Sequence, residues 1–88
     1  MNENDVTVRY WAAARAAAGV AEEQVAAGTL AELLAEIGRR HGHRDRFHDV
    51  IGICSILVGD TPVGSMDPAG VSLAPGTHVE FLPPFAGG

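Results

Sequence analysis

Residues 29–41 read TLAELLAEIGRRH, and this stretch carries the clearest structural signal in the chain. Thr29 and Glu32 have the spacing of a capping box, in which two side chains satisfy the free N–H groups at a helix start. Apolar residues then recur at i, i+3, i+4 and i+7, the spacing of one helical face: Leu30, Leu33, Leu34 and Ile37. We predict an amphipathic helix over 30–41, with basic residues in its last turn and Gly42 as a left-handed cap.

Strand patterns lie on the N-terminal side of this helix. Val6, Val8 and Tyr10 alternate with polar or amphipathic residues, so we predict a half-buried strand over 5–11. A weaker pattern predicts that residues 22–27 pair back as a second strand. The alanine-rich segment 12–18 is too short for an independent helix, and we expect a helical turn or a loop there.

The C-terminal half adds further strands. Polar residues 43–49 predict a loop, and the apolar run 51–58 predicts a central strand buried on both faces. Residues 61–63 are expected to return as a short strand. Residues 77–82 alternate, with Val79 and Phe81 on one face. One helix on a mixed sheet of four to five strands is an α+β domain, expected over 1–82 with an extended tail over 83–88.

Composition narrows the possible functions. A chain of 88 residues buries little core in which to shelter a catalytic cavity, so we expect function on a surface or a terminus. The net charge of −5 argues against nucleic acid or an anionic membrane and favours a basic protein partner. Cys54 is the single cysteine, which excludes an intramolecular disulfide. The acidic start and the lack of a long apolar run lead us to expect a cytoplasmic protein.

The last six residues, PPFAGG, suggest where the chemistry lies. Pro83 and Pro84 favour extended backbone, and an extended chain of this length reaches roughly 20 Å. Gly87 and Gly88 lack Cβ atoms, which suits them to a narrow channel in another protein. The functional group offered by such an end is the Gly88 carboxylate. Since an ionised carboxylate is a poor electrophile, we expect activation as an acyl adenylate.

These patterns together resemble the ubiquitin-like β-grasp fold and, more narrowly, the MoaD/ThiS sulfur carriers. The resemblance covers essentially the whole chain and is carried by residues 8–15 (VRYWAAAR), by Gly19 and by residues 79–88 (VEFLPPFAGG). A terminal diglycine alone is weak evidence. The same diglycine after a strand and two prolines is more specific, and it looks most like the small subunit of molybdopterin synthase.

The resemblance implies a protein co-substrate and not an enzyme. In that family an E1-like adenylating enzyme of the MoeB/ThiF type uses Mg-ATP to adenylate the terminal glycine, here Gly88, and a sulfur donor then leaves a thiocarboxylate. The loaded tail enters the large subunit of molybdopterin synthase, of the MoaE type, and gives its sulfur to a pyranopterin precursor. The resemblance thus implies partner contacts through the tail and no cofactor bound by this chain; the tail residues concerned are Pro83, Pro84, Phe85, Ala86 and Gly87.

Three alternatives remain open at this point. The same chemistry serves thiamine, cysteine or thiolated natural products in related carriers. A ubiquitin-like modifier would instead join Gly88 to lysines of other proteins. An inert β-grasp interaction module would show no ATP-dependent activation.

Other residues receive plainer interpretations. Cys54 is expected to be a small core residue and not a sulfur relay. His41, His43 and His48 lack the converging ligand pattern of a metal site, so we predict none. The arginines that follow the long helix are expected to form a solvated helix end: Arg39, Arg40, Arg44 and Arg46. Trp11 and Leu82 fall on the outward phase of their strands, which fits either packing at an edge or an apolar docking patch.

Overall fold

The computed structural model describes residues 5–84. Its elements follow in chain order: β1 (Asp5–Tyr10), α1 (Ala12–Ala18), β2 (Glu22–Ala26), α2 (Leu30–His41), α3 (Phe47–Gly52), β3 (Ser55–Val58), β4 (Thr61–Pro62), the 3-10 helix η1 (Pro68–Gly70) and β5 (His78–Leu82). The strands form a five-stranded sheet in the order β2-β1-β5-β3-β4. The pairing of β1 with β5 is parallel and the other pairings are antiparallel, so the sheet is mixed as predicted.

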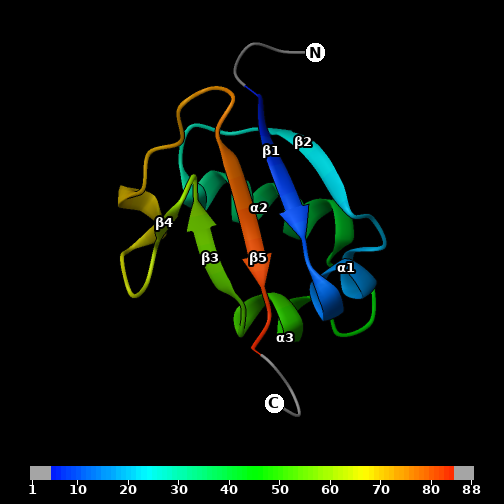
Figure 1. The fold of residues 1–88 in the computed structure, drawn as a ribbon. Helices are drawn as coiled ribbons and strands as arrows, with labels where there is room; N and C mark the ends of the chain where they lie inside the picture. Colours follow the sequence, from blue (N-terminus) through cyan, green and yellow to red (C-terminus); the bar gives the residue numbers. More distant parts are fainter. Residues whose placement is uncertain (1–4, 85–88) are drawn as a thin grey trace.

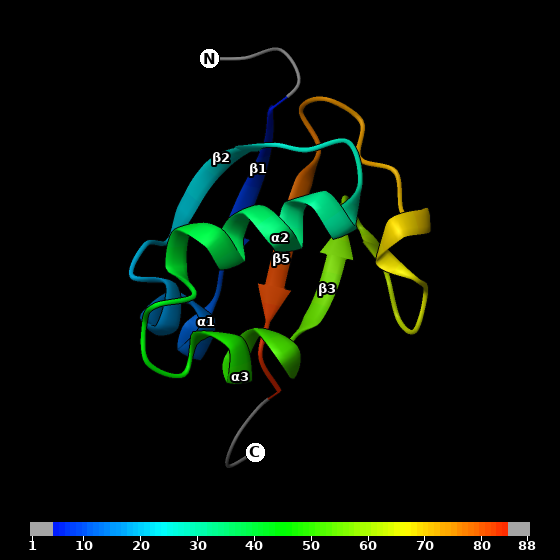
Figure 2. The same ribbon diagram turned by 180° about the vertical axis from the view of Figure 1, so that it is seen from behind.

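The helices cover one face of the sheet and one of its ends. Figure 2 shows α2 lying across the strands on one face, and Figure 1 shows the opposite face uncovered by any helix of residues 5–84. Both β1 and β5 run toward the end where α1 and α3 lie (Figure 1). Because β1 and β5 are parallel neighbours, the residues that follow each strand emerge side by side at this end.

The core lies between the sheet and α2. The inward residues of β1, namely Val6, Val8 and Tyr10, are buried, as are Val79 and Phe81 of β5. The buried face of α2 consists of Leu30, Leu33 and Ile37. The predicted alternation in both strands is therefore confirmed, and it assigns the other residues of each strand to the open face.

The long helix has its predicted limits, but its caps differ in detail. The Thr29 hydroxyl accepts a hydrogen bond from the Glu32 N–H at 3.1 Å, as a capping box requires. The Glu32 carboxylate accepts from the N–H of Gly28 at 2.7 Å, one residue before the expected donor. The left-handed conformation predicted for Gly42 is wrong, since its φ is −62°. Glycine is needed there for space, because a Cβ would meet the Gly38 carbonyl oxygen and would lie 2.7 Å from His48 Nε2.

Two sequence predictions for residues 43–58 are wrong. The segment 43–49 is not wholly a loop, because α3 begins at Phe47. The run 51–58 is not one strand, because its first two residues end α3 and β3 starts at Ser55. Phe47 and Val50 are buried and lie three residues apart, which is the spacing of a short helix packed on α1. Ile53, which follows α3, is 63% exposed, so the apolar run is not buried on both faces.

The alanine-rich segment forms a complete short helix rather than a turn. Ala14, Ala17 and Ala18 of α1 are buried, and tertiary packing thus supplies the stability that a seven-residue helix lacks alone. The predicted strands otherwise differ from the observed ones by one residue at an end. No helix of the described residues is long and apolar enough to span a lipid bilayer.

Candidate docking face and the base of the tail

The uncovered face of the sheet presents a small apolar group around one carboxylate. Alternation along β5 puts Glu80 and Leu82 on this face, since Val79 and Phe81 point into the core. Leu57 of β3 is the register partner of Glu80 and therefore shares its face. These three side chains are half-buried. Together with Trp11 they form what we call the docking face: Trp11, Leu57, Glu80 and Leu82.

Trp11 joins this face directly after β1. Its backbone N–H donates to the Phe81 carbonyl oxygen at 3.1 Å, which continues the ladder between β1 and β5 by one residue. Its side chain is 44% exposed, and the indole Nε1 donates to Glu80 Oε1 at 2.8 Å. The next residue, Ala12, has a φ of +48° and starts α1. This left-handed residue redirects the chain into the helix immediately after Trp11.

The base of the tail lies at the same end of the sheet. Leu82 ends β5 opposite Ser55, and Pro83 and Pro84 follow outside regular structure. Pro83 is half-buried and Pro84 is exposed. The structure therefore brings Trp11, Leu82 and the first two tail residues to one end of one face. The remaining predicted site residues, Phe85, Ala86, Gly87 and Gly88, lie outside the described residues.

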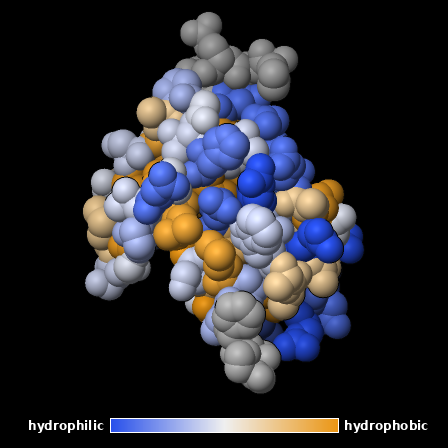
Figure 3. Space-filling view, in the orientation of Figure 1, coloured by the Kyte–Doolittle hydropathy of each residue, from blue (hydrophilic) through white to orange (hydrophobic). Residues whose placement is uncertain are grey.

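Figure 3 shows the docking side of the molecule in space-filling form. Hydrophobic surface gathers on the lower middle of this face, and hydrophilic side chains lie above it. Sequence reasoning named Trp11 and Leu82 but missed Leu57, because the run 51–58 was interpreted as buried on both sides. It also missed Glu80, although the strand alternation that selected Leu82 places Glu80 on the same face.

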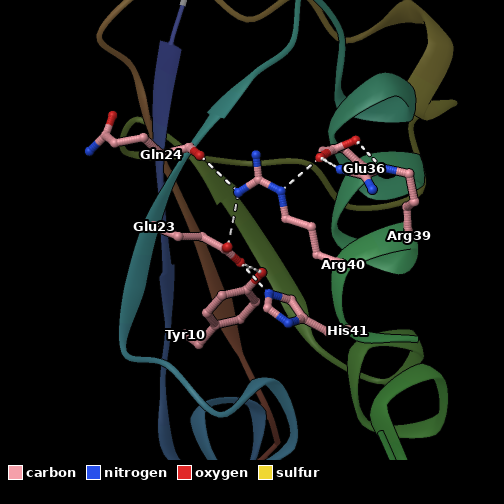
Figure 4. A network of polar contacts seen from close by, with 7 residues as sticks. All are labelled: Tyr10, Glu23, Gln24, Glu36, Arg39, Arg40 and His41. Carbon is pink, nitrogen blue, oxygen red and sulfur yellow. Dashed lines mark hydrogen bonds and ion pairs between the residues drawn. The ribbon is translucent and has the colours of Figure 1, made fainter. Parts of the chain in front are cut away.

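Behind the face, a polar network fixes the ends of β1, β2 and α2 (Figure 4). The Glu23 carboxylate accepts from the Tyr10 hydroxyl at 2.7 Å, from His41 Nε2 at 2.6 Å and from Arg40 Nη1 at 3.0 Å. Burial alone would raise the pKa of Glu23, but the hydrogen bonds from Tyr10, His41 and Arg40 outweigh it and hold that pKa below its ordinary value. Burial and the bond to Glu23 raise the pKa of Tyr10, so its hydroxyl stays a donor.

The end of α2 is thus only partly the solvated helix end that we predicted. Arg40 turns toward the sheet, where its Nη1 also donates to the Gln24 carbonyl oxygen at 2.9 Å. Arg39 is exposed and pairs with Glu36, which also accepts from Arg40 Nε at 2.7 Å. Hydrogen bonds from Arg39 and Arg40 lower the pKa of Glu36 to about 2. Arg44 leaves this cluster, and its Nε donates to the Ala17 carbonyl oxygen at 3.1 Å.

Cys54 lies between α3 and β3, directly before the first residue of β3. The sequence had placed it within the strand. It is half-buried against the core, and its Sγ donates to the Val50 carbonyl oxygen at 3.2 Å. Burial raises the pKa of the thiol, which lowers the thiolate fraction that a sulfur relay needs. These observations favour the structural interpretation of Cys54.

The histidines named in the sequence have separate roles. His41 bonds Glu23, while the His48 ring meets the Phe47 ring with centroids 5.6 Å apart. In the part of the chain that the structure describes, no three His, Cys, Asp or Glu side chains gather as metal ligands would. A metal-free chain remains a prediction.

Residues 8–88 match the sequence model of the ThiS family. The chain belongs to the ThiS family. A search of curated proteins finds no match. Several solved structures resemble this ThiS-family chain, and three of them are representative.

The first is the putative subunit 1 of molybdopterin converting factor from Pyrococcus furiosus. It is 25% identical, with a TM-score of 0.73, and the match covers 92% of this chain and 98% of that one. The second is the complex of subunits 1 and 2 of molybdopterin-converting factor from Helicobacter pylori. Its matching chain is 24% identical, with a TM-score of 0.69 and coverage of 96% and 99%.

The third is small archaeal modifier protein 1 from Methanosarcina acetivorans. It is 18% identical, with a TM-score of 0.77 and full coverage of both chains. The predicted α+β β-grasp fold is confirmed by these neighbours. Membership of the ThiS family makes the chain a ThiS/MoaD-type sulfur carrier or a ubiquitin-like modifier. The structural likeness favours neither kind of neighbour.

Proposed function

We propose that this chain is a sulfur carrier that acts as the small subunit of molybdopterin synthase. An E1-like adenylating enzyme of the MoeB/ThiF type binds Mg-ATP and transfers AMP to the carboxylate of Gly88. Pyrophosphate leaves, and the acyl carbon becomes electrophilic. A sulfur donor then attacks this carbon and displaces AMP, and a thiocarboxylate remains at Gly88. The proposed setting of this chemistry is the cytoplasm.

The observation that carries this proposal is the position of the docking face beside the base of the tail. Trp11 and Leu82 lie at the end of the sheet from which Pro83 and Pro84 depart, and the chain ends in two glycines. A partner that binds the docking face therefore fixes the position at which the tail begins. The tail then needs few other contacts to reach a reacting group, because its starting point is already positioned.

In this proposal all catalytic side chains belong to the partners. The chain supplies the acyl group, the docking face that partners bind, and the extended tail. The large subunit of molybdopterin synthase, of the MoaE type, supplies the site of sulfur transfer. The Helicobacter pylori neighbour is named as a complex of subunits 1 and 2 of such a factor, which supports this choice of recipient.

A ubiquitin-like modifier is the second candidate. Its basis is the likeness in fold to small archaeal modifier protein 1 over the full length of both chains. Both candidates begin with adenylation of Gly88 and differ in the nucleophile, which is sulfur in one and a lysine amine in the other. The chain itself contains no lysine, so a conjugate would involve lysines of other proteins.

Intact mass spectrometry tests the proposal directly. The chain is incubated with a MoeB/ThiF-type enzyme, Mg-ATP and a sulfur donor. We expect a mass increase equal to the difference between sulfur and oxygen, and no increase for a chain that lacks Gly88. Addition of the MoaE-type subunit and the pyranopterin precursor should then return the original mass as molybdopterin forms.

Each other result points to a different function. A loaded chain that keeps its sulfur in the presence of the large subunit would contradict the molybdopterin assignment. An amide-linked adduct on another protein would indicate the modifier. A chain that exchanges no pyrophosphate would indicate an inert interaction module.

A further inference from the structure

Glu80 lies at the centre of the docking face with part of its hydrogen-bonding capacity unused. Its Oε1 accepts from Trp11 Nε1 at 2.8 Å. Within residues 5–84 no arginine or histidine forms an ion pair with it. Arg9 is its register neighbour on β1, yet the Arg9 guanidinium pairs with Glu22 on the other side, at 3.3 Å. The carboxylate therefore keeps its charge available on the open side of the sheet.

Apart from Arg9 on β1, the neighbours of this carboxylate on the open face are apolar. Leu57 flanks it on β3, Leu82 follows it on the same face of β5, and the Trp11 indole lies against its first oxygen. A protein that covers these apolar groups also removes water from Glu80. Removing water from a carboxylate is costly unless the covering surface supplies a positive group and hydrogen bonds. The docking face therefore favours a partner surface that carries a positive group among apolar side chains.

We propose that Glu80 is the charge anchor of the docking face and pairs with an arginine or lysine that the adenylating partner presents among apolar side chains. The identity of that partner rests on the proposed function. The hydrogen bond from the Trp11 indole N–H holds the Glu80 carboxylate in place before the partner binds, which reduces the entropy lost on docking. The chain's net charge of −5 adds a long-range attraction for a basic surface.

Glu80→Gln is the sharpest test, because glutamine keeps an oxygen that accepts from Trp11 and removes only the charge. ATP–pyrophosphate exchange by the MoeB/ThiF-type enzyme is measured over a range of carrier concentrations. We expect the KM for the carrier to rise about tenfold with kcat unchanged, because a docking contact acts before the chemical step. Added NaCl should raise the KM of the wild type more steeply than that of Glu80→Gln.

Asp60→Asn is the matched control. Asp60 is exposed in the turn between β3 and β4, outside the docking face, and within residues 5–84 it forms no ion pair. The same change of charge there should leave the KM within about twofold of the wild type. Circular dichroism melting curves of both variants establish that each is folded.

The outcomes separate this inference from the proposed function. An unchanged KM for Glu80→Gln, or equal increases for Glu80→Gln and Asp60→Asn, would overturn the role of Glu80 while leaving carrier activity intact. A wild-type chain that supports no exchange would overturn the proposed function, and this inference with it.

Discussion

The ring of Tyr10 stacks on the ring of Phe81, with centroids 5.7 Å apart and planes inclined by 20°. Each ring belongs to the residue before a member of the docking face, since Trp11 follows Tyr10 and Leu82 follows Phe81. The buried ring pair therefore fixes the spacing of Trp11 and Leu82 on the docking face. The Tyr10 hydroxyl is held in turn by Glu23, so the polar network behind the sheet also supports the docking face.

The first prediction concerns Glu23. Its pKa in the folded chain is below the ordinary value of 4.5, so its charge stabilises the fold above that pH, and the contribution disappears as the pH falls through the folded pKa. Glu23→Gln should lower the free energy of unfolding by about 1–2 kcal/mol at pH 7 and by less in acid. Urea unfolding at pH 7 and at acid pH measures both values.

Glu36 bonds Arg39 and Arg40, and these bonds lower its pKa to about 2. Glu36→Gln is therefore the comparison that separates the arginine side of the network from the bonds of Glu23 to Tyr10 and His41. If Glu23→Gln unfolded at the same urea concentration as the wild type at pH 7, the charge of Glu23 would contribute nothing to stability.

The second prediction concerns Gly19, which ends α1 with a φ of +83°. A Cβ at this position would lie 2.7 Å from the Arg44 guanidinium carbon. Gly19→Ala should therefore lower the free energy of unfolding by about 1–2 kcal/mol, through both the left-handed backbone and the displaced arginine. Thermal melting compares it with Gly52→Ala, where the added Cβ meets nothing within 4 Å. Equal melting temperatures for the two variants would refute the prediction.

The third prediction concerns Cys54. Cys54→Ala removes a half-buried sulfur and its bond to the Val50 carbonyl oxygen, so the free energy of unfolding should fall by about 1 kcal/mol. Sulfur loading should be unchanged, because the raised pKa of the thiol makes it a poor nucleophile. Loading is followed by intact mass. Loss of loading in a folded Cys54→Ala chain would make the thiol part of the relay.

The fourth prediction concerns Gly87, which lies outside the described residues. Gly87→Ala should leave the melting temperature unchanged, since the core is built from residues between Val6 and Phe81. Activation should fall sharply, because a methyl group must then pass a channel that suits glycine and the backbone loses conformations open to glycine alone. ATP–pyrophosphate exchange at matched concentrations is the measurement. Equal rates would favour the inert interaction module.

The sequence predicted those elements whose signal is local. The helix over 30–41 has a cap, a periodic apolar face and a basic end within itself, and these agree with its tertiary packing. The inward residues of β1 and β5 followed from simple alternation in the same way. For these elements, the apolar pattern in the sequence by itself identifies the residues that are buried in the fold.

The elements that sequence reasoning missed depend on distant partners. α1 and α3 are short helices that pack on each other, and neither carries a side-chain cap at its start. Their stability comes from packing on each other and on the core, which no local pattern reports. Glu80 was overlooked for a similar reason. Its significance comes from Leu57 on β3 and from Trp11, which directly follows β1.

The parallel pairing of β1 with β5 joins the first and last strands at the middle of the sheet. On a ribosome, β1–β2 and β3–β4 are made well before the strand that must fit between them. Neither hairpin can complete the apolar core until residues 78–82 have been synthesised, because β5 separates the two in the sheet. Trp11 and Leu57 therefore come to lie on either side of β5 only after residues 78–82 have been made. A chain truncated before residue 78 therefore has neither an assembled docking face nor the tail that follows β5, so a partner that needs both does not bind it.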